Sequence, residues 1–243
     1  MRASGLICTV AVWSLSWGTA QAATSDDGWQ FVVAPYIWAA GINGQMGAAG
    51  TKQHVNISFS DIVDNLDMAY MFQVEARKGK FGFVVSPVYL DLTNKDKSPL
   101  LSTKVDLTST IVDGFVTWQA AEGFELLFGA RYANMDGKLR LSTPLATVSA
   151  SGSKNWTDAI MGFRFAHDFG QHWVFNMRAD VGGGPAGESD LTWSANGQIG
   201  YKFGDGGSRL FVGYRAIDYD YEDNGFTFNA VTGGPIVGFA WIF

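Results

Sequence analysis

The sequence contains one cysteine, six prolines and three histidines among 243 residues. A lone thiol cannot form an internal disulfide, so the stability of the fold must come from backbone pairing and packing. Asp and Glu number 23 against 17 Lys and Arg, which gives a formal net charge of −6. No basic stripe is present that could meet phosphates, so the chain is not expected to bind nucleic acid.

A long apolar run is also missing beyond the N-terminal 22 residues. A transmembrane helix needs about 20 consecutive apolar residues, and no apolar stretch in this part of the chain approaches that length. The composition is nevertheless apolar, with 47% hydrophobic residues, 14% aromatic residues, 16% charged residues and 30 glycines. These values are typical of a β-rich protein. A membrane protein made from this chain must therefore cross the bilayer as a closed barrel, in which no strand edge meets lipid.

The N-terminal residues are typical of a secretory signal. Arg2 supplies a positive charge, an apolar stretch runs from Leu6 to Trp17, and Ala20-Gln21-Ala22 has the small-x-small pattern of a cleavage site. We expect a signal peptide over residues 1–22, cleaved after Ala22, and a barrel domain over residues 23–243. The only cysteine would leave with the signal peptide.

Apolar and polar residues alternate with a period of two after the signal, which is the pattern of β-strands. The alternation is cleanest over Asp67–Lys78, His172–Gly182 and Asp190–Phe203. A soluble sandwich would alternate as well, but its interior could not take several large aromatic residues from each of about ten strands. A lipid-facing surface can accommodate that many aromatic residues. The pattern therefore favours an all-β, closed antiparallel up-and-down transmembrane β-barrel.

The sequence predicts ten strands, an even number, as in bacterial single-chain barrels. Eight or twelve strands remain alternatives because such boundaries err by about 2–4 residues. The predicted strands are Trp29–Ala40, Asp67–Lys78, Lys80–Thr93, Val105–Ala120, Phe124–Leu141, Trp156–Phe169, His172–Gly182, Asp190–Phe203, Ser208–Tyr221 and Phe226–Phe243.

Short turns alternate with longer predicted loops, as expected for periplasmic turns and extracellular loops. The longer loops are predicted at residues 41–66, 94–104, 142–155 and 183–189. Within the first loop, Val55–Phe59 can extend a hairpin, and Ser60–Asp64 starts like a capped helical turn.

Three positions break the alternation. A bulge at Pro87 would turn Tyr89 inward and Val88 toward lipid. Asp113 and Asp218 fall on an apolar phase and require a similar slip, or a place near the membrane interface.

The final strand has apolar side chains at every second position, ending on Phe239, Trp241 and Phe243. Together with the export signal and the alternating strands, this ending resembles the small outer-membrane β-barrel proteins of Gram-negative, proteobacterial type. The segments Ala34–Trp38 and Phe59–Asp67, with Glu75–Gly79, further resemble an uncharacterised group of such barrels.

The resemblance implies a fold and a location, the cell outer membrane with its lipid, and it implies no activity. It also implies that Phe239, Trp241 and Phe243 form an assembly signal read by the barrel-assembly machinery during insertion. The barrel is expected to be a monomer.

The polar face of the strands carries charges of both signs, which at membrane depth must be paired or hydrated. A narrow pore would use them for selectivity, whereas a filled lumen would pair them, because a barrel of this size is only just wide enough for its side chains. We expect an Arg–carboxylate lattice, with Asp168, Asp180 and Asp218 near its arginines. The candidate lumen charges are Glu75, Arg77, Glu125, Arg131, Asp158, Arg164, Arg178, Asp180, Lys202 and Arg215.

Histidines offer the only starting points for catalysis or metal binding. His54 lies near Asp61 and Asp64 in the first loop, which leaves an outer-membrane hydrolase as an alternative. His167 and His172 flank a short turn, but no further ligand accompanies them at metal-binding spacing. We therefore predict no catalytic site, cofactor or metal. The predicted function is a structural or passive-transport barrel, with adhesion or interaction through the loops as the alternative.

Overall fold

The computed structural model describes residues 28–48, 51–97, 102–142, 147–204 and 207–243. The predicted signal peptide, residues 1–22, lies outside this range. In the described residues, no helix has both the length and the apolar character needed to cross a bilayer.

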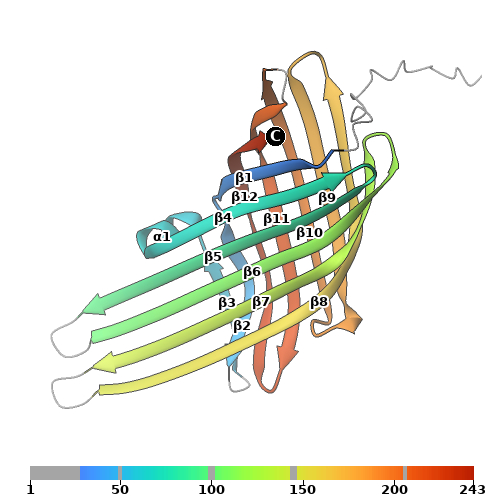
Figure 1. Ribbon diagram of the computed structural model, residues 1–243. Helices are drawn as coiled ribbons and strands as arrows, with labels where there is room; N and C mark the ends of the chain where they lie inside the picture. Colours follow the sequence, from blue (N-terminus) through green and yellow to red (C-terminus); the bar gives the residue numbers. More distant parts are fainter. Residues whose placement is uncertain (1–27, 49–50, 98–101, 143–146, 205–206) are drawn as a thin grey trace, which may run out of the picture.

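Twelve strands of the described chain form one antiparallel sheet, and ten of them close into a barrel in the order β1-β4-β5-β6-β7-β8-β9-β10-β11-β12, with β12 paired back to β1 (Figure 1). The prediction of ten barrel strands is confirmed, and β2 and β3 are additional. The elements are β1 (Gln30–Trp38), β2 (Gly41–Ala48), β3 (Thr51–Ile57), α1 (Phe59–Asp64), β4 (Leu66–Lys78), β5 (Phe81–Lys97), β6 (Ser102–Ala121), β7 (Phe124–Ser142), β8 (Thr147–Phe169), β9 (Trp173–Gly187), β10 (Leu191–Phe203), β11 (Ser208–Asp223) and β12 (Phe226–Ile242).

The barrel closes along β12. Phe31 and Phe243 exchange backbone hydrogen bonds of 2.7 and 3.0 Å at the end where the short turns lie, which we call the turn end. β2 then continues along β12 in the register that β1 began, from the pair Gly41–Gly233 to the pair Gly47–Thr227. β1 and β2 therefore form one nearly continuous strand that extends the wall at the opposite end, which we call the far end.

The predicted loops at 94–104, 142–155 and 183–189 are wrong in extent, because most of their residues belong to strands. β5 runs to Lys97, and β8 begins at Thr147. Pairing between neighbouring strands continues into these segments, as in the pairs Lys97–Ser102 and Ser142–Thr147. Figure 1 shows β5 to β8 leaving the barrel at the far end as a long ribbon that diverges from β9 to β12.

The predicted loop 41–66 is also mostly ordered. The hairpin extension predicted at Val55–Phe59 is confirmed only in part: the hairpin is formed by β2 and β3 and ends at Ile57, and Phe59 already belongs to the helical turn α1. Its N-cap is Ser58, two residues earlier than expected, where the Asp61 amide donates to the Ser58 hydroxyl and the Ser58 amide donates to the Asp61 carboxylate. The capping box therefore fixes where the helix begins.

The predicted slip at Pro87 does not occur. β5 and β6 keep one register from Phe81 to Lys97, with Pro87 paired to Val112. Val88 consequently points inward and is 2% exposed, while Tyr89 faces outward and stacks on Tyr70 with ring centroids 4.7 Å apart. The β4–β5 ladder is interrupted at Pro87, between the pairs Met71–Val88 and Val74–Val85.

Outward-facing side chains form an apolar belt around the turn-end half of the wall. Ten aromatic residues near the turn end have 41–70% of their surface exposed; they are Trp29, Phe31, Phe81, Phe83, Trp118, Phe169, Trp173, Phe203, Trp241 and Phe243. Soluble monomers rarely expose contiguous apolar patches beyond about 300–600 Å². A ring of aromatic residues at one edge of an apolar band is the surface that barrels present to a bilayer.

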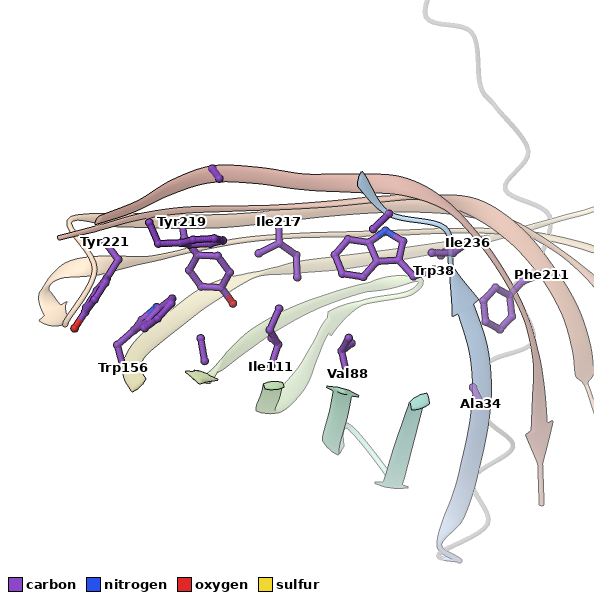
Figure 2. Packing of buried hydrophobic residues seen from close by; sticks show 14 of the residues in the cluster. Ala34, Trp38, Val88, Ile111, Trp156, Phe211, Ile217, Tyr219, Tyr221 and Ile236 are labelled. Atoms are coloured by element: carbon purple, nitrogen blue, oxygen red, sulfur yellow. The ribbon is translucent and has the colours of Figure 1, made fainter. Parts of the chain in front are cut away.

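Side chains fill the far-end part of the barrel interior. The main buried cluster gathers Trp38, Val88, Ile111, Trp156 and Ile217 with neighbouring rings at the far end (Figure 2). The hydrophobic core of this fold thus lies inside the lumen, and the charged residues share that space.

Candidate functional site

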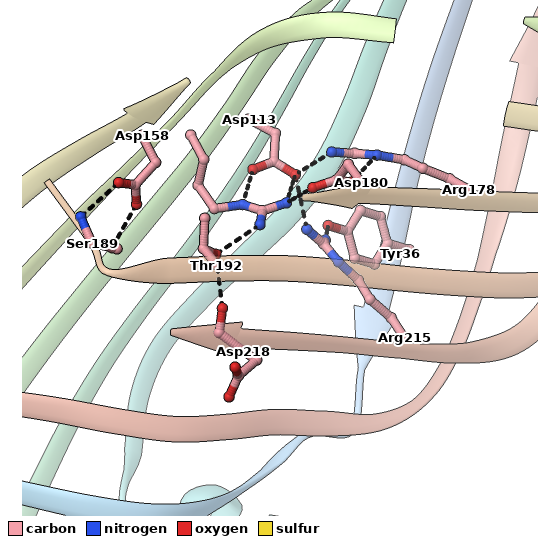
Figure 3. A network of polar contacts seen from close by, with 10 residues as sticks. Tyr36, Asp113, Asp158, Arg178, Asp180, Ser189, Thr192, Arg215 and Asp218 are labelled. Atoms are coloured by element: carbon pink, nitrogen blue, oxygen red, sulfur yellow. Dashed lines mark hydrogen bonds and ion pairs between the residues drawn. The ribbon is translucent and has the colours of Figure 1, made fainter. Parts of the chain in front are cut away.

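The barrel interior brings polar and charged residues together at two levels. The central network comprises Asp113, Arg131, Arg178, Asp180 and Arg215 (Figure 3). The lower network lies nearer the turn end and comprises Glu75, Arg77, Glu125 and Arg164.

Asp113 is the centre of the central network. Its carboxylate accepts from Arg131 Nε at 2.8 Å, from Arg178 Nη2 at 3.0 Å and from Arg215 Nη2 at 3.3 Å. Arg131 also reaches Asp180 Oδ1 at 2.8 Å, and neither Arg131 nor Asp113 has any exposed surface. Three strands therefore deliver guanidinium groups to a carboxylate on a fourth.

Neutral groups complete the hydrogen bonding of these arginines. Thr192 Oγ1 accepts from Arg131 Nη1 at 3.1 Å and donates to the backbone oxygen of Asp218 at 2.7 Å. Tyr36 Oη accepts from Arg215 Nη1 at 2.7 Å. Buried charge is tolerated only when such partners replace water, and each of these two arginines has them.

Asp113 requires a correction to the prediction, because β6 and β7 keep one register from Ser102 to Gln119 and no slip brings this residue inward. It shares the inward phase of β6 with Ile111, Phe115 and Thr117, all buried. Because Ile111 and Phe115 on the same face are apolar, the sequence pattern did not identify this face as the one that points into the lumen. Its position opposite Arg131 on β7 is the signal that could have placed it.

Asp218 and Asp168 are also corrected. Asp218 lies on the outward phase of β11, between inward-facing Ile217 and Tyr219, and only its backbone oxygen meets the network. Asp168 pairs with Lys202, at 2.6 Å, instead of with an arginine.

Asp158 is buried without an arginine partner among the described residues. Its carboxylate accepts from the Ser189 hydroxyl at 2.7 Å and from the amides of Glu188 and Ser189 at 2.9 and 2.8 Å. The connection between β9 and β10 is thereby held against β8, so this residue anchors a loop.

The lower network joins opposite charges from three strands, β4, β7 and β8. Arg164 Nη1 lies 2.8 Å from Glu75 Oε2, and Arg164 Nε lies 2.8 Å from Glu125 Oε2. Arg77 pairs with the same two carboxylates. Gly82 leaves room for this arrangement, because a Cβ there would lie 2.6 Å from Thr117 Oγ1 and 3.2 Å from Glu75 Oε1.

An aromatic cap closes the lumen at the far end. It consists of Trp156, Tyr219, Tyr221, Phe226 and Phe228, whose ring centroids lie 4.3–6.5 Å from that of Trp156. Trp156 has no exposed surface, and Phe228 has 1%. The sequence interpretation missed this cap because inward-facing aromatics had been assigned to lipid.

The turn-end half of the lumen contains a cavity of about 360 Å³. Its lining reaches from Arg178 and Arg215 in the central network to Gln30, Glu122 and Ile242 at the rim. The lower network forms part of its wall.

The histidines are not grouped into a reactive site. His54 is exposed on β3. Among the described residues, it forms no ion pair with Asp61 or Asp64. His167 stacks on Phe165 with centroids 6.3 Å apart, and His172 stacks on Tyr201 at 5.4 Å. The described residues contain no group of three or more His, Cys, Asp or Glu residues suited to a metal ion.

No family model matches the chain, and no curated protein matches it. Among solved structures, the attachment invasion locus protein Ail of Yersinia pestis is similar at 13% identity, covering 90% of this chain and 100% of that one, with a TM-score of 0.38. Neisserial surface protein A is similar at 12% identity over 88% and 97% of the two chains, with a TM-score of 0.35. The toluene transporter TodX of Pseudomonas putida is similar at 11% identity over 90% and 91%, with a TM-score of 0.31.

Proposed function

We propose that the protein is an outer-membrane β-barrel whose resting lumen is closed to solutes and whose role is structural or interactive. The observation that carries the proposal is the stack of two sealed layers across the lumen. In the central network, Arg131 and Asp113 have no exposed surface, and in the aromatic cap Trp156 has none. A water-filled pore would leave such side chains hydrated.

The location in the membrane is supported by the apolar belt with its aromatic rim at the turn end. Beyond the belt, the outward phase becomes polar, as in Asp106, Asp136 and Lys138. The polar extension formed by β5 to β8 would then stand in water, where it could meet a partner. The predicted reading of Phe239, Trp241 and Phe243 by the barrel-assembly machinery remains part of this proposal.

Passive transport is the second candidate, and the cavity at the turn end favours it because half of the lumen already contains space. Passage would require the aromatic cap and the central network to separate. The two candidates therefore differ in a single observable, the resting conductance.

Planar-bilayer recording of the refolded, full mature barrel tests the proposal. We expect a flat current trace from samples whose gel mobility shifts on heating, as a folded barrel's does. Stable stepwise conductance from the same samples would overturn the closed lumen and favour passive transport. Protein that remains soluble without detergent and runs identically before and after heating would contradict the membrane location.

A further inference from the structure

The cavity at the turn end is large enough to hold a small molecule. Its volume of about 360 Å³ lies within the range of about 300–1,000 Å³ that is usual for ligand pockets. Its lining extends to the rim at Gln30 and Ile242, so a molecule could enter without crossing the central network or the aromatic cap.

The lining of the cavity is divided into an apolar side and a polar side. Six apolar lining residues come from β1, β11 and β12, next to the polar lining residues Gln30, Tyr36, Arg209 and Arg215 of the same strands: Val32, Ala34, Phe211, Ile236, Ala240 and Ile242. The lower network and the polar residues of β9 and β10 lie on the other side. A ligand that matched both sides would be amphiphilic.

Positive charge is in excess around the cavity. Within the described residues, Arg209 lines the cavity and has no carboxylate within ion-pair distance. The central network above it holds three guanidinium groups, on Arg131, Arg178 and Arg215, against two carboxylates, on Asp113 and Asp180. The lower network is balanced, with two arginines and two glutamates, and Glu122 adds one carboxylate at the rim, which leaves an excess of one positive charge. An anion would therefore be attracted more strongly than a cation.

Three buried amide atoms on the same wall have no protein partner in the described structure. They are Asn176 Nδ2, Asn196 Oδ1 and Gln198 Oε1, and all three residues line the cavity. Asn176 and Gln198 are directly paired across β9 and β10. Buried polar atoms normally find a partner, so the Asn176 Nδ2 donor indicates a bound acceptor, whereas the two amide oxygens need a donor such as water.

We propose that this cavity binds a small amphiphile with one carboxylate group. The carboxylate would pair with Arg209 and accept from Asn176, while a short alkyl or aryl body would rest against Phe211 and the apolar side chains of β1 and β12. The site is independent of whether the far end ever opens, because it is reached from the turn end.

Isothermal titration of the full mature barrel in phosphatidylcholine nanodiscs, with empty nanodiscs subtracted, tests this proposal. The probes are sodium hexanoate, hexan-1-ol and hexylammonium, which share one chain length and differ in head-group charge. We expect hexanoate to bind at least about tenfold more tightly than the other two, since a hydrogen bond to a charged group contributes about 1.5–3 kcal/mol.

Two variants locate the binding. Arg209→Gln should weaken hexanoate binding about tenfold, whereas Arg140→Gln, which removes the same charge from an exposed position on β7, should leave it unchanged. Ala240→Phe should block all three probes by filling the apolar side.

Equal affinities for hexanoate and hexan-1-ol, or no saturable hexanoate binding, would overturn the proposal and leave a water-filled cavity. Hexanoate binding that survives both Arg209→Gln and Ala240→Phe would place the probe elsewhere and overturn it as well. If Arg209→Gln does not fold by heat-shifted gel mobility, Ala240→Phe and the head-group comparison decide.

Discussion

The indole ring of Trp156 stacks on the phenol ring of Tyr221, with centroids 4.3 Å apart and planes inclined by 12°. Trp156 belongs to β8 and Tyr221 to β11, and two strands separate them around the wall. The contact therefore crosses the lumen. It joins the diverging β5–β8 side of the barrel to the β9–β12 side, just where a path through the lumen would have to open.

Replacing Trp156 by alanine should remove the centre of the aromatic cap and leave a cavity. We expect the free energy of unfolding to fall by about 3–5 kcal/mol, the usual cost of truncating a buried aromatic residue to alanine. Urea titration in detergent, followed by the heat-shifted gel band, measures the change. Trp118→Ala is the matched control, because this side chain faces outward and is 43% exposed. Equal losses in the two variants would contradict a structural role for the cap.

Asp113→Ala should be the most damaging removal of a lumen charge, because three guanidinium groups share this carboxylate. Breaking a buried pair by deleting one partner costs about 3–5 kcal/mol, since the remaining charge is left without compensation. Glu222→Ala serves as the control. Its pair with Lys52 is exposed, with 51% and 43% side-chain exposure, and such pairs contribute about 0–1 kcal/mol. The same unfolding assay would contradict the central network if both variants lost similar stability.

Much of the wall could be predicted from the sequence because lipid and lumen impose opposite chemistry on alternate residues. Strands such as β9 and β10 follow that rule, with Trp173 outside and Val174 inside, and their outward and inward sets agree with the structure. The count of barrel strands follows from the same rule.

The interior was harder to predict because its far-end half breaks that rule. Trp156, Tyr219 and Phe228 are apolar and yet face the lumen, where they are buried by one another. Asp113 lies among such apolar residues on β6, so its inward orientation could not be predicted from the alternation. Which carboxylate meets which arginine depends on strand register across several neighbours, and a single strand's pattern carries no information about that.

Gly82→Ala should disturb the lower network. The new Cβ would lie 2.6 Å from Thr117 Oγ1 and 3.2 Å from Glu75 Oε1, so the hydroxyl and carboxylate would have to shift. We expect a loss of about 1–3 kcal/mol in unfolding free energy, as is usual for overpacking. Gly114→Ala on β6 is the control, since no atom would lie within 4 Å of its Cβ. If Gly82→Ala lowered the unfolding free energy no more than Gly114→Ala does, the lower network would have room for the added methyl group, which would contradict the prediction.

The capping box of α1 should make the helix sensitive to acid. The Ser58 hydroxyl and amide donate to Asp61 Oδ2 at 2.6 and 2.9 Å, and these hydrogen bonds lower the pKa of the Asp61 carboxyl below its ordinary value. A carboxyl with a lowered folded-state pKa stabilises the fold above its unfolded pKa of about 3.9, and this contribution is lost as the pH falls through the folded-state pKa. Helix α1 should thus keep constant protection from neutral pH to about pH 5 and lose it in stronger acid.

Carbon-detected NMR of the Asp61 carboxyl, with amide exchange at Asn65, measures this directly, because the Asn65 amide donates to Ile62 O at 3.2 Å at the end of the helix. In Ser58→Ala, the Asp61 titration should move upward in pH, and amide exchange at Asn65 should be faster already at neutral pH. Ser60→Ala is the matched control, since the Ser60 hydroxyl touches only that of Ser58, at 2.8 Å, and should move the midpoint much less. An Asp61 midpoint that is the same in all three proteins would show that the capping box contributes nothing, and that α1 is held by its other contacts, such as the buried Ile62 and the Thr93 amide that donates to Asn65 O at 2.8 Å.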